Sequence, residues 1–376
     1  MEISAIHVCP VRGLSTLDPP DPRRMGEAAR AAKNLGLKKL LVPVLEESLL
    51  RITREKVRFL DGLVEAMDQM ASVPMEAWLV APAQKILGLY WIPPYLAGAT
   101  PDPGARPAFV DGKVRNLRPY RWWTDPSIME KRLAVFRELL LALKAHPAIR
   151  GYILMDRELE WARPDAEVAD LLLKSYIGEV REQAEDIPIY LGLGWKELLE
   201  PGLSLEAAGQ VNGIKMNGLD EEPVGIDIPG HPAGEMFLTA YIGALSHWLF
   251  NKPVEIVSGW HLTKGKIDRD HLLELLPGLL SGRGISGVIW PSLIDPEPSL
   301  ADFPPWFLEP EMKEISLLDS GAEPKDGAEA LLKVFRSCTP EANSLDFVDI
   351  SGKEYAEDPD THFKRLWNHF RESADP

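Results

Sequence analysis

The chain has 376 residues, of which 45% are hydrophobic and 26% are charged, and its formal net charge at pH 7 is −16. This length fits one large domain, and the composition is that of a folded protein with ample apolar residues for a core. The acidic balance argues against nucleic acid or an anionic membrane as a partner, because basic patches bind both. Neutral or cationic ligands are expected instead.

Several simple features concern cell compartment and cofactors. No apolar run approaches the roughly 20 residues of a membrane span, and the start, MEISAIHVCP, lacks the basic-then-apolar pattern of a secretory signal. A cytoplasmic protein is therefore predicted. Cys9 and Cys338 lie far apart in the sequence and match no metal or redox motif, so both are expected to be buried, unreactive thiols. Neither a metal nor an organic cofactor is implied.

Short apolar runs alternate with segments of helical periodicity along most of the chain. Such alternation is typical of βα units around a parallel sheet. Amphipathic helices are expected at 24–35, 54–70, 128–145 and 166–184, between the runs. Eight units without a glycine-rich phosphate turn after the first run favour a closed (β/α)8 TIM barrel over an open doubly wound sheet. The eight runs are 4–10, 39–45, 75–82, 151–156, 188–194, 211–217, 253–260 and 287–293.

Two parts of the chain fall outside this alternation. Residues 83–125 form a long insertion after the third run, rich in Pro, Gly, Tyr and Trp and without a periodicity of its own. Loops that follow the strands form the catalytic face of a barrel, so its aromatic side chains are expected to overhang that face. After a helix expected at 325–336, residues 337–376 read as a small acidic C-terminal extension with a terminal helix, which leaves 1–336 as the barrel.

Tryptophan recurs where the expected strands end. Indole faces can stack on the apolar C–H faces of sugar rings, so these positions point to a carbohydrate ligand. With His261 and the insertion's Trp123, they make up the predicted substrate-binding set: Trp91, Trp123, Trp161, Trp195, Trp260, His261 and Trp290.

Carboxylates cluster at the end of the fourth run. The motif DRELEW places Asp156, Glu158 and Glu160 at alternate positions, which point to one side while the chain stays extended. Neighbouring carboxylates raise one another's pKa, as a general acid at neutral pH requires. Glu158 is the predicted proton donor, with Asp156 or Asp295 as the second carboxylate. Alternatively, Glu158 and Glu160 begin an exposed turn and pair with Arg157 and Arg163 at the surface.

With these elements placed, the chain resembles the superfamily of retaining (β/α)8 glycoside hydrolases that includes cellulases, mannanases and β-galactosidases. The likeness lies in the overall layout and in three stretches, HPAIRGYILMDRELEW, GVIWPSLIDPEP and SLLDSGAEPKDGAEALLKVF. The resemblance implies an acid/base residue in an Asn-Glu pair at the end of the fourth strand, and a sugar subsite floored by Trp290.

The chain departs from that family at both catalytic positions. Arg157 falls either at the family's Asn position or at its acid position, depending on the alignment. In KPVEIVSGW, Ser258 stands where the family has its nucleophilic Glu, and Glu255 should lie deeper in the barrel and face the other way. Three functions remain open: a hydrolase with another carboxylate, a non-catalytic carbohydrate-binding protein, or a different reaction on the same scaffold. Of these, we predict the first, a glycosidase that acts on a carbohydrate or glycoconjugate by paired-carboxylate acid/base chemistry, with the non-catalytic binding protein as the alternative.

Overall fold

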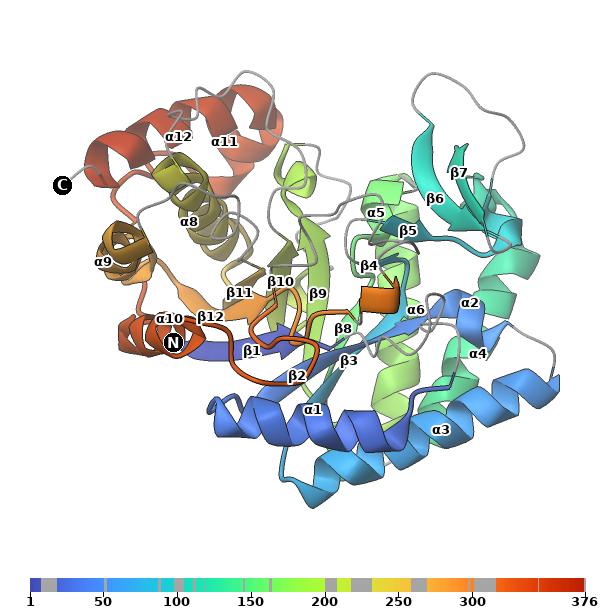
Figure 1. Cartoon of the computed structure of the whole chain (residues 1–376). Helices are drawn as coiled ribbons and strands as arrows, with labels where there is room; N and C mark the ends of the chain where they lie inside the picture. Colours follow the sequence, from blue (N-terminus) through green and yellow to red (C-terminus); the bar gives the residue numbers. More distant parts are fainter. Residues whose placement is uncertain are drawn as a thin grey trace.

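The computed structural model of the chain contains a closed barrel of eight parallel strands, which confirms the predicted fold (Figure 1). It describes residues 1–7, 19–50, 53–86, 89–97, 105–110, 113–118, 120–144, 146–161, 164–199, 208–217, 232–257, 269–296, 298–300, 316–343 and 345–374. The barrel strands are β1 (Glu2–Ile6), β2 (Lys39–Leu45), β3 (Glu76–Ala83), β8 (Ile149–Leu154), β9 (Ile189–Gly194), β10 (Gly213–Asn217), β11 (Val254–Val257) and β12 (Ile285–Trp290).

The first and last barrel strands close the sheet. Ala5 of β1 pairs with Trp290 of β12, and on the other side Ser4 pairs with Lys39 of β2. This pairing excludes the open doubly wound sheet. Each expected apolar run overlaps one barrel strand, because strands covered on both faces are apolar along most of their length.

Glycines make room for large side chains inside the barrel. A Cβ atom at Gly151 would lie 2.5 Å from the indole of Trp78, and one at Gly213 would lie 2.5 Å from the ring of Tyr190. The two rings meet edge to face with centroids 4.8 Å apart. Bulky side chains on some strands therefore require glycine on their neighbours, which is how small barrels fill their interior layers.

Helices form the outer wall, and two of them show clear start signals. Asp21 accepts a hydrogen bond from the Arg23 amide at 2.9 Å, and Asp125 accepts one from the Ser127 amide at 3.0 Å. In both cases proline follows the capping Asp, an arrangement that favours helix initiation. The wall consists of α1 (Pro22–Asn34), α3 (Thr53–Ser72), α4 (Pro126–Ala142), α6 (Ala166–Gln183), α8 (Pro232–Phe250), α9 (Arg269–Leu280) and α10 (Ala328–Ser337). Short helices α2 (Glu46–Leu49), η3 (Trp195–Leu198) and η5 (Pro298–Leu300) follow strands.

The C-terminal helices α11 (Gly352–Glu357) and α12 (Pro359–Ala374) cover α8. Every residue of α8 from 238 to 246 is buried, which one contact face alone could not achieve. Tyr241 of α8 donates a hydrogen bond to the Phe363 carbonyl at 2.6 Å, and its ring contacts Trp367 and Phe370. The extension is thus packed against the barrel wall, and a domain boundary between residues 336 and 337 remains a prediction.

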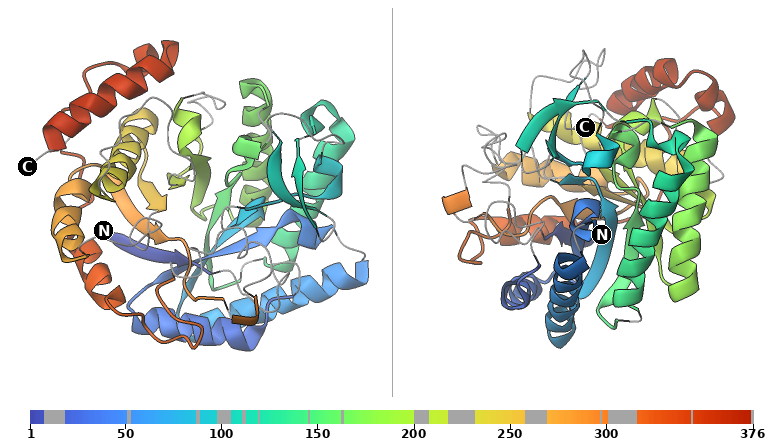
Figure 2. Two further views of the ribbon diagram at one scale, coloured as in Figure 1. Left: turned by 45° about the horizontal axis from the view of Figure 1, so that its top comes forward. Right: turned by 90° about the vertical axis from the view of Figure 1, so that its right-hand side faces the viewer.

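The insertion has secondary structure of its own, so the expectation of an unstructured loop was wrong. Its four-stranded sheet contains β4 (Lys85–Ile86), β5 (Leu89–Trp91), β6 (Arg106–Val110) and β7 (Lys113–Leu117), in that order. Short 3-10 turns η1 (Pro94–Leu96) and η2 (Trp122–Thr124) follow β5 and β7. Both figures show this sheet and the C-terminal helices on opposite sides of the barrel (Figures 1 and 2).

The insertion sheet packs onto the barrel interior. Trp91 and Phe109 belong to the same hydrophobic cluster as the barrel residues Leu41, Ile153 and Ile289. The sheet therefore extends the interior core at the end where the strands finish. Among the helices that the structure describes, none has the length and apolar character needed to cross a membrane.

Candidate functional site

The chain turns sharply after β8, so the predicted row of carboxylates does not form. Met155 and Arg157 have positive φ angles of 53° and 59°, and the short helix α5 runs from Glu158 to Trp161. Residues in the left-handed region break the extended alternation that would place Asp156 and Glu158 on one side. The expectation of an extended DRELEW segment was therefore wrong, and Asp156 and Glu158 have different partners.

Asp156 sits inside the end of the barrel and is held by residues of β10. The Lys215 ammonium lies 2.7 Å from both carboxylate oxygens, and the Asn217 amide donates to Oδ1 at 2.9 Å. Asn217 also donates to the Leu193 carbonyl at 3.0 Å, which fixes its orientation. A Cβ atom at Gly192 would lie 2.5 Å from the Asp156 backbone, so the position needs glycine. Asp156 is thus a buried, fixed carboxylate with a positive charge beside it.

A second buried ion pair lies deeper in the barrel. The Lys39 ammonium contacts Glu255 Oε1 at 2.5 Å and stacks on Trp78 with its nitrogen 4.4 Å from the ring centroid. Burial raises the pKa of Glu255, and the charge of Lys39 opposes that rise. The predicted deep position of Glu255 is confirmed, whereas Ser258 lies outside the described residues.

Glu158 is completely buried and pairs with Arg132 of α4, so the alternative of an exposed turn was wrong as well. Arg132 also binds both oxygens of Glu46 at 2.9 Å, and its guanidinium stacks on Trp122 at 4.3 Å. Burial raises the pKa of Glu158, while the adjacent Arg132 charge lowers it. One oxygen of Glu158, Oε2, has no hydrogen-bond partner among the described residues.

The insertion completes this network. Tyr95 donates its hydroxyl hydrogen to Glu46 at 2.6 Å, and the Gln84 amide lies 3.5 Å from the other oxygen of the same carboxylate. Neither Glu46 nor Arg132 is among the site residues predicted from the sequence. The signal was weak, since a single arginine inside an amphipathic helix usually faces solvent.

Asp295 is held by the segment that follows the barrel. Its Oδ2 lies 2.5 Å from the Lys325 ammonium, and its backbone amide donates to the Leu318 carbonyl at 3.0 Å. Burial raises the pKa of Asp295, and Lys325 partly offsets the rise. These partners differ from those of Asp156 and Glu158, and the role of Asp295 as a second carboxylate remains a prediction.

The predicted sugar-binding tryptophans divide into three groups. Trp123 is partly buried and meets Trp122 edge to face at 5.8 Å. Trp260 and His261 lie outside the described residues. The other four rings are at most 5% exposed and pack on protein side chains: Trp91 on Phe109, Trp161 on Tyr90, Trp195 on Phe363 and Trp290 on Phe335.

A stacking platform needs one open ring face, so Trp123 is the strongest candidate among the predicted tryptophans whose side chains the structure describes. Sugar binding by any of them stays a prediction. Across the described residues, no group of three or more His, Cys, Asp or Glu is arranged to hold a metal ion.

Solved structures share this fold. No family model matches the chain, and no curated protein matches it either. A GH5_18 protein from Streptomyces cattleya in complex with GlcNAc has a TM-score of 0.73 at 14% identity, over 99% of this chain and 92% of that one. The exo-beta-1,4-mannosidase Op5Man5 from Opitutaceae bacterium strain TAV5 has a TM-score of 0.69 at 15% identity, and the match covers 90% of this chain and 59% of the mannosidase. A beta-galactosidase from the psychrophilic Marinomonas ef1 has a TM-score of 0.60 at 12% identity, and the match covers 89% of this chain and 59% of the galactosidase.

These matches define the class of fold. The barrel is that of the GH5-type glycoside hydrolases, as the sequence resemblance predicted. At 12–15% identity the likeness concerns the fold alone, and this chain spans less than two thirds of the mannosidase's length.

Proposed function

We propose that this protein binds a carbohydrate at the end of the barrel where β8, β9 and β10 finish, and that it does so without hydrolysing a glycosidic bond by the paired-carboxylate mechanism. Ligands of barrel proteins bind at the ends of the strands, where the loops converge. Two of the similar structures are complexes with sugars, one with GlcNAc and another with Manb1-4GlcNAc. The shared fold supports a sugar ligand for this chain by analogy.

One observation carries the non-hydrolytic part of the proposal: Asp156 and Glu158, which follow β8, are each engaged by a cation of the protein itself. Asp156 is 4% exposed and bound by Lys215, and Glu158 is fully buried and bound by Arg132. A general acid has to reach the glycosidic oxygen at hydrogen-bond distance and pass it a proton. A carboxylate enclosed by a guanidinium and protein side chains is poorly placed to do so.

Binding and turnover can be measured separately. Titration of a glycan panel is expected to reveal a sugar that binds, while aryl glycosides and natural oligosaccharides remain uncleaved. Replacing Asn217 with Ala removes an amide that orients Asp156 and should weaken binding, whereas Lys364→Ala on the exposed face of α12 should not. Cleavage by the unmodified protein, or an unaltered affinity of Asn217→Ala, would contradict the proposal.

Hydrolysis with Glu158 as proton donor is the second candidate. Its support is the pKa of Glu158, which burial raises, together with the unpartnered Oε2 atom. Under this hypothesis Asp156 or Asp295 is the second carboxylate. The sugar subsites are shaped by Trp91, Trp161, Trp260, His261 and Trp290. Glu158→Gln should then abolish turnover and leave sugar affinity nearly unchanged. Equal turnover in this variant and the unmodified protein would rule out that role.

A further inference from the structure

The charge of this protein is distributed unevenly. The insertion, residues 83–125, contains six Lys or Arg, three Asp and no Glu, so its 43 residues carry a net charge of +3. The other 333 residues therefore carry −19. The whole-chain value of −16 conceals this contrast, and with it a basic region on an acidic protein.

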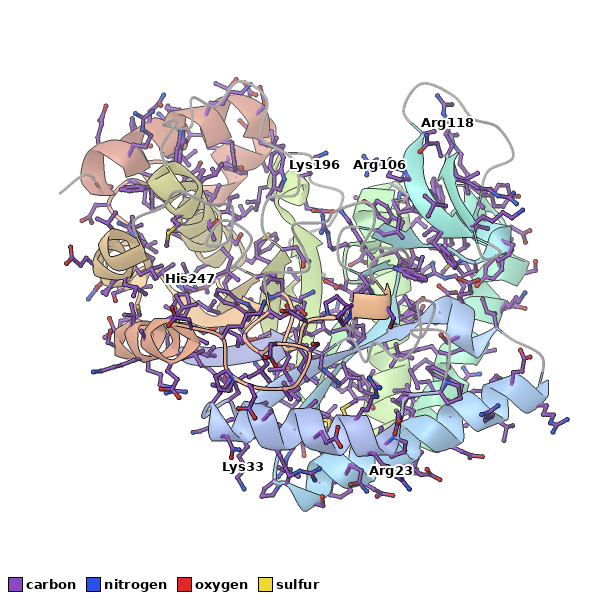
Figure 3. The ribbon with its side chains drawn as sticks, viewed as in Figure 1. Arg23, Lys33, Arg106, Arg118, Lys196 and His247 are labelled. Atoms are coloured by element: carbon purple, nitrogen blue, oxygen red, sulfur yellow. The ribbon has the colours of Figure 1, made fainter. Side chains whose placement is uncertain are left out.

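Most of these cations lie together at the outer end of the insertion sheet. Lys113 and Arg115 are exposed on β7, the edge strand, and Arg118 and Arg121 are exposed just beyond it. We call residues 113–121 the basic arm. Figure 3 shows Arg118 of this arm on the side of the molecule away from Arg23 and Lys33 of α1, and Figure 1 shows β6 and β7 projecting from the barrel.

An exposed aromatic residue lies close to these cations in the sequence. Tyr120 is 43% exposed, one of four exposed large hydrophobic side chains that the structure describes, and it falls between Arg118 and Arg121 in the sequence. Its backbone amide donates to the Leu96 carbonyl at 3.0 Å, which ties this part of the arm to η1. An exposed ring close in sequence to several cations suits a ligand with both apolar ring faces and negative charge.

Protection of the sheet edge explains only part of the pattern. Charged side chains on an edge strand discourage pairing with other chains, which accounts for Lys113 and Arg115. Arg118, Tyr120 and Arg121 follow the strand and protect no edge. Edge protection therefore does not account for Arg121 and Tyr120, whereas a charged ligand would.

We propose that the basic arm binds an anionic polysaccharide, one with a carboxylate on its sugar units, through Arg115, Arg121 and the ring of Tyr120. This inference rests on the proposed carbohydrate function and adds the substrate class. A nucleic acid fits less well, because its denser negative charge would be repelled more strongly by the acidic body beside the arm. A sugar chain with one charge per unit is repelled less by the acidic body, so its attraction to the cations of the arm exceeds that repulsion.

The test compares two ligands that differ only in charge. Homogalacturonan oligomers carry a carboxylate on each sugar, and their fully methyl-esterified form carries none. Calorimetry at low ionic strength should show binding of the acidic form that weakens as salt is added. The triple variant Lys113→Gln, Arg115→Gln, Arg121→Gln should bind it roughly tenfold more weakly, as expected for the loss of three exposed charge pairs.

A matched control separates the arm from net charge. The variant Arg23→Gln, Arg30→Gln, Lys33→Gln makes the same change of charge on exposed positions of α1 and should retain the affinity within about twofold. Tyr120→Ala, which changes no charge, should also weaken binding. Circular dichroism and thermal melts confirm that each variant is folded.

Four outcomes would overturn the proposal. The first two are equal affinity for the acidic and esterified oligomers, and equal losses of affinity in both triple variants. The other two are tighter arm-dependent binding of a single-stranded DNA oligomer, and self-association that only the arm variant abolishes while no oligomer binds. Manb1-4GlcNAc, a neutral sugar, reports on the barrel end alone. If Manb1-4GlcNAc does not bind but the acidic oligomers bind through the arm, the proposed function fails and this inference stands. If Manb1-4GlcNAc binds but the acidic oligomers do not, this inference fails and the proposed function stands.

Discussion

Replacing Arg132 with Met should destabilise the protein strongly. Its side chain is 0% exposed and neutralises two carboxylates, Glu46 and Glu158, that are each 1% exposed. Methionine fills similar space but leaves both carboxylates without their shared cation. Breaking a buried ion pair from one side costs about 3–5 kcal/mol, because the remaining charge is neither solvated nor paired. That loss is a large share of the roughly 5–15 kcal/mol that stabilises a typical domain.

Urea unfolding followed by tryptophan fluorescence measures this loss, and two further variants identify its origin. Glu158→Gln should change the free energy of unfolding by only about 1 kcal/mol, since burial already raises the pKa of Glu158 and glutamine can accept the same hydrogen bond. Combined with Arg132→Met it should recover part of the loss, so that the two effects are not additive. A loss below about 1 kcal/mol in Arg132→Met would refute the reasoning, because exposed pairs contribute that much.

Two further predictions concern His7 and Gly192. Burial lowers the pKa of His7 from 6.5 to about 4. Between these pH values the unfolded chain binds a proton at His7 that the folded chain does not. The free energy of unfolding should therefore fall by about 2–3 kcal/mol as the pH drops from 7 to 4. Urea melts at several pH values should show a shallower fall in His7→Asn, and an identical fall would contradict the assignment. Gly192→Ala should cost more than about 2 kcal/mol, because the added Cβ meets the Asp156 backbone at 2.5 Å. Gly178→Ala in α6, where the Cβ meets nothing within 4 Å, should instead stabilise by up to about 1 kcal/mol, and equal effects of the two substitutions in thermal melts would be inconsistent with the packing.

The barrel could be predicted from the sequence because its signals are local and repeated. The run at 188–194 coincides with β9, Ile189–Gly194, and the helix expected at 166–184 coincides with α6, Ala166–Gln183. Strands buried on both faces need continuous apolar residues, and the helices that cover them need an apolar stripe. Both requirements appear within a dozen residues of sequence.

The insertion and the β8 end could not be predicted in the same way. Strands of two to five residues, such as β4 and β7, are too short to show a period of two. Met155 and Arg157 have positive φ angles although neither is glycine, so the sequence DRELEW contains no residue that predicts the turn. The partner of Glu158 is 26 residues earlier in another helix, and only the folded chain brings the two together.

Stability and turnover make opposite demands on Glu158. The ion pair with Arg132 fixes α5 against α4 and holds the turn that follows β8, which requires the carboxylate to stay charged and enclosed. Proton donation requires the same group to be protonated and open to a ligand. Hydrolysis through Glu158 would therefore need Arg132 to release it, at the cost of leaving that guanidinium with Glu46 alone. Asp156 faces the same conflict, since Lys215 holds both of its oxygens. Because Asp156 and Glu158 are each bound by a structural cation, the proposed sugar binding, unlike hydrolysis through either carboxylate, does not require these stabilising interactions to break.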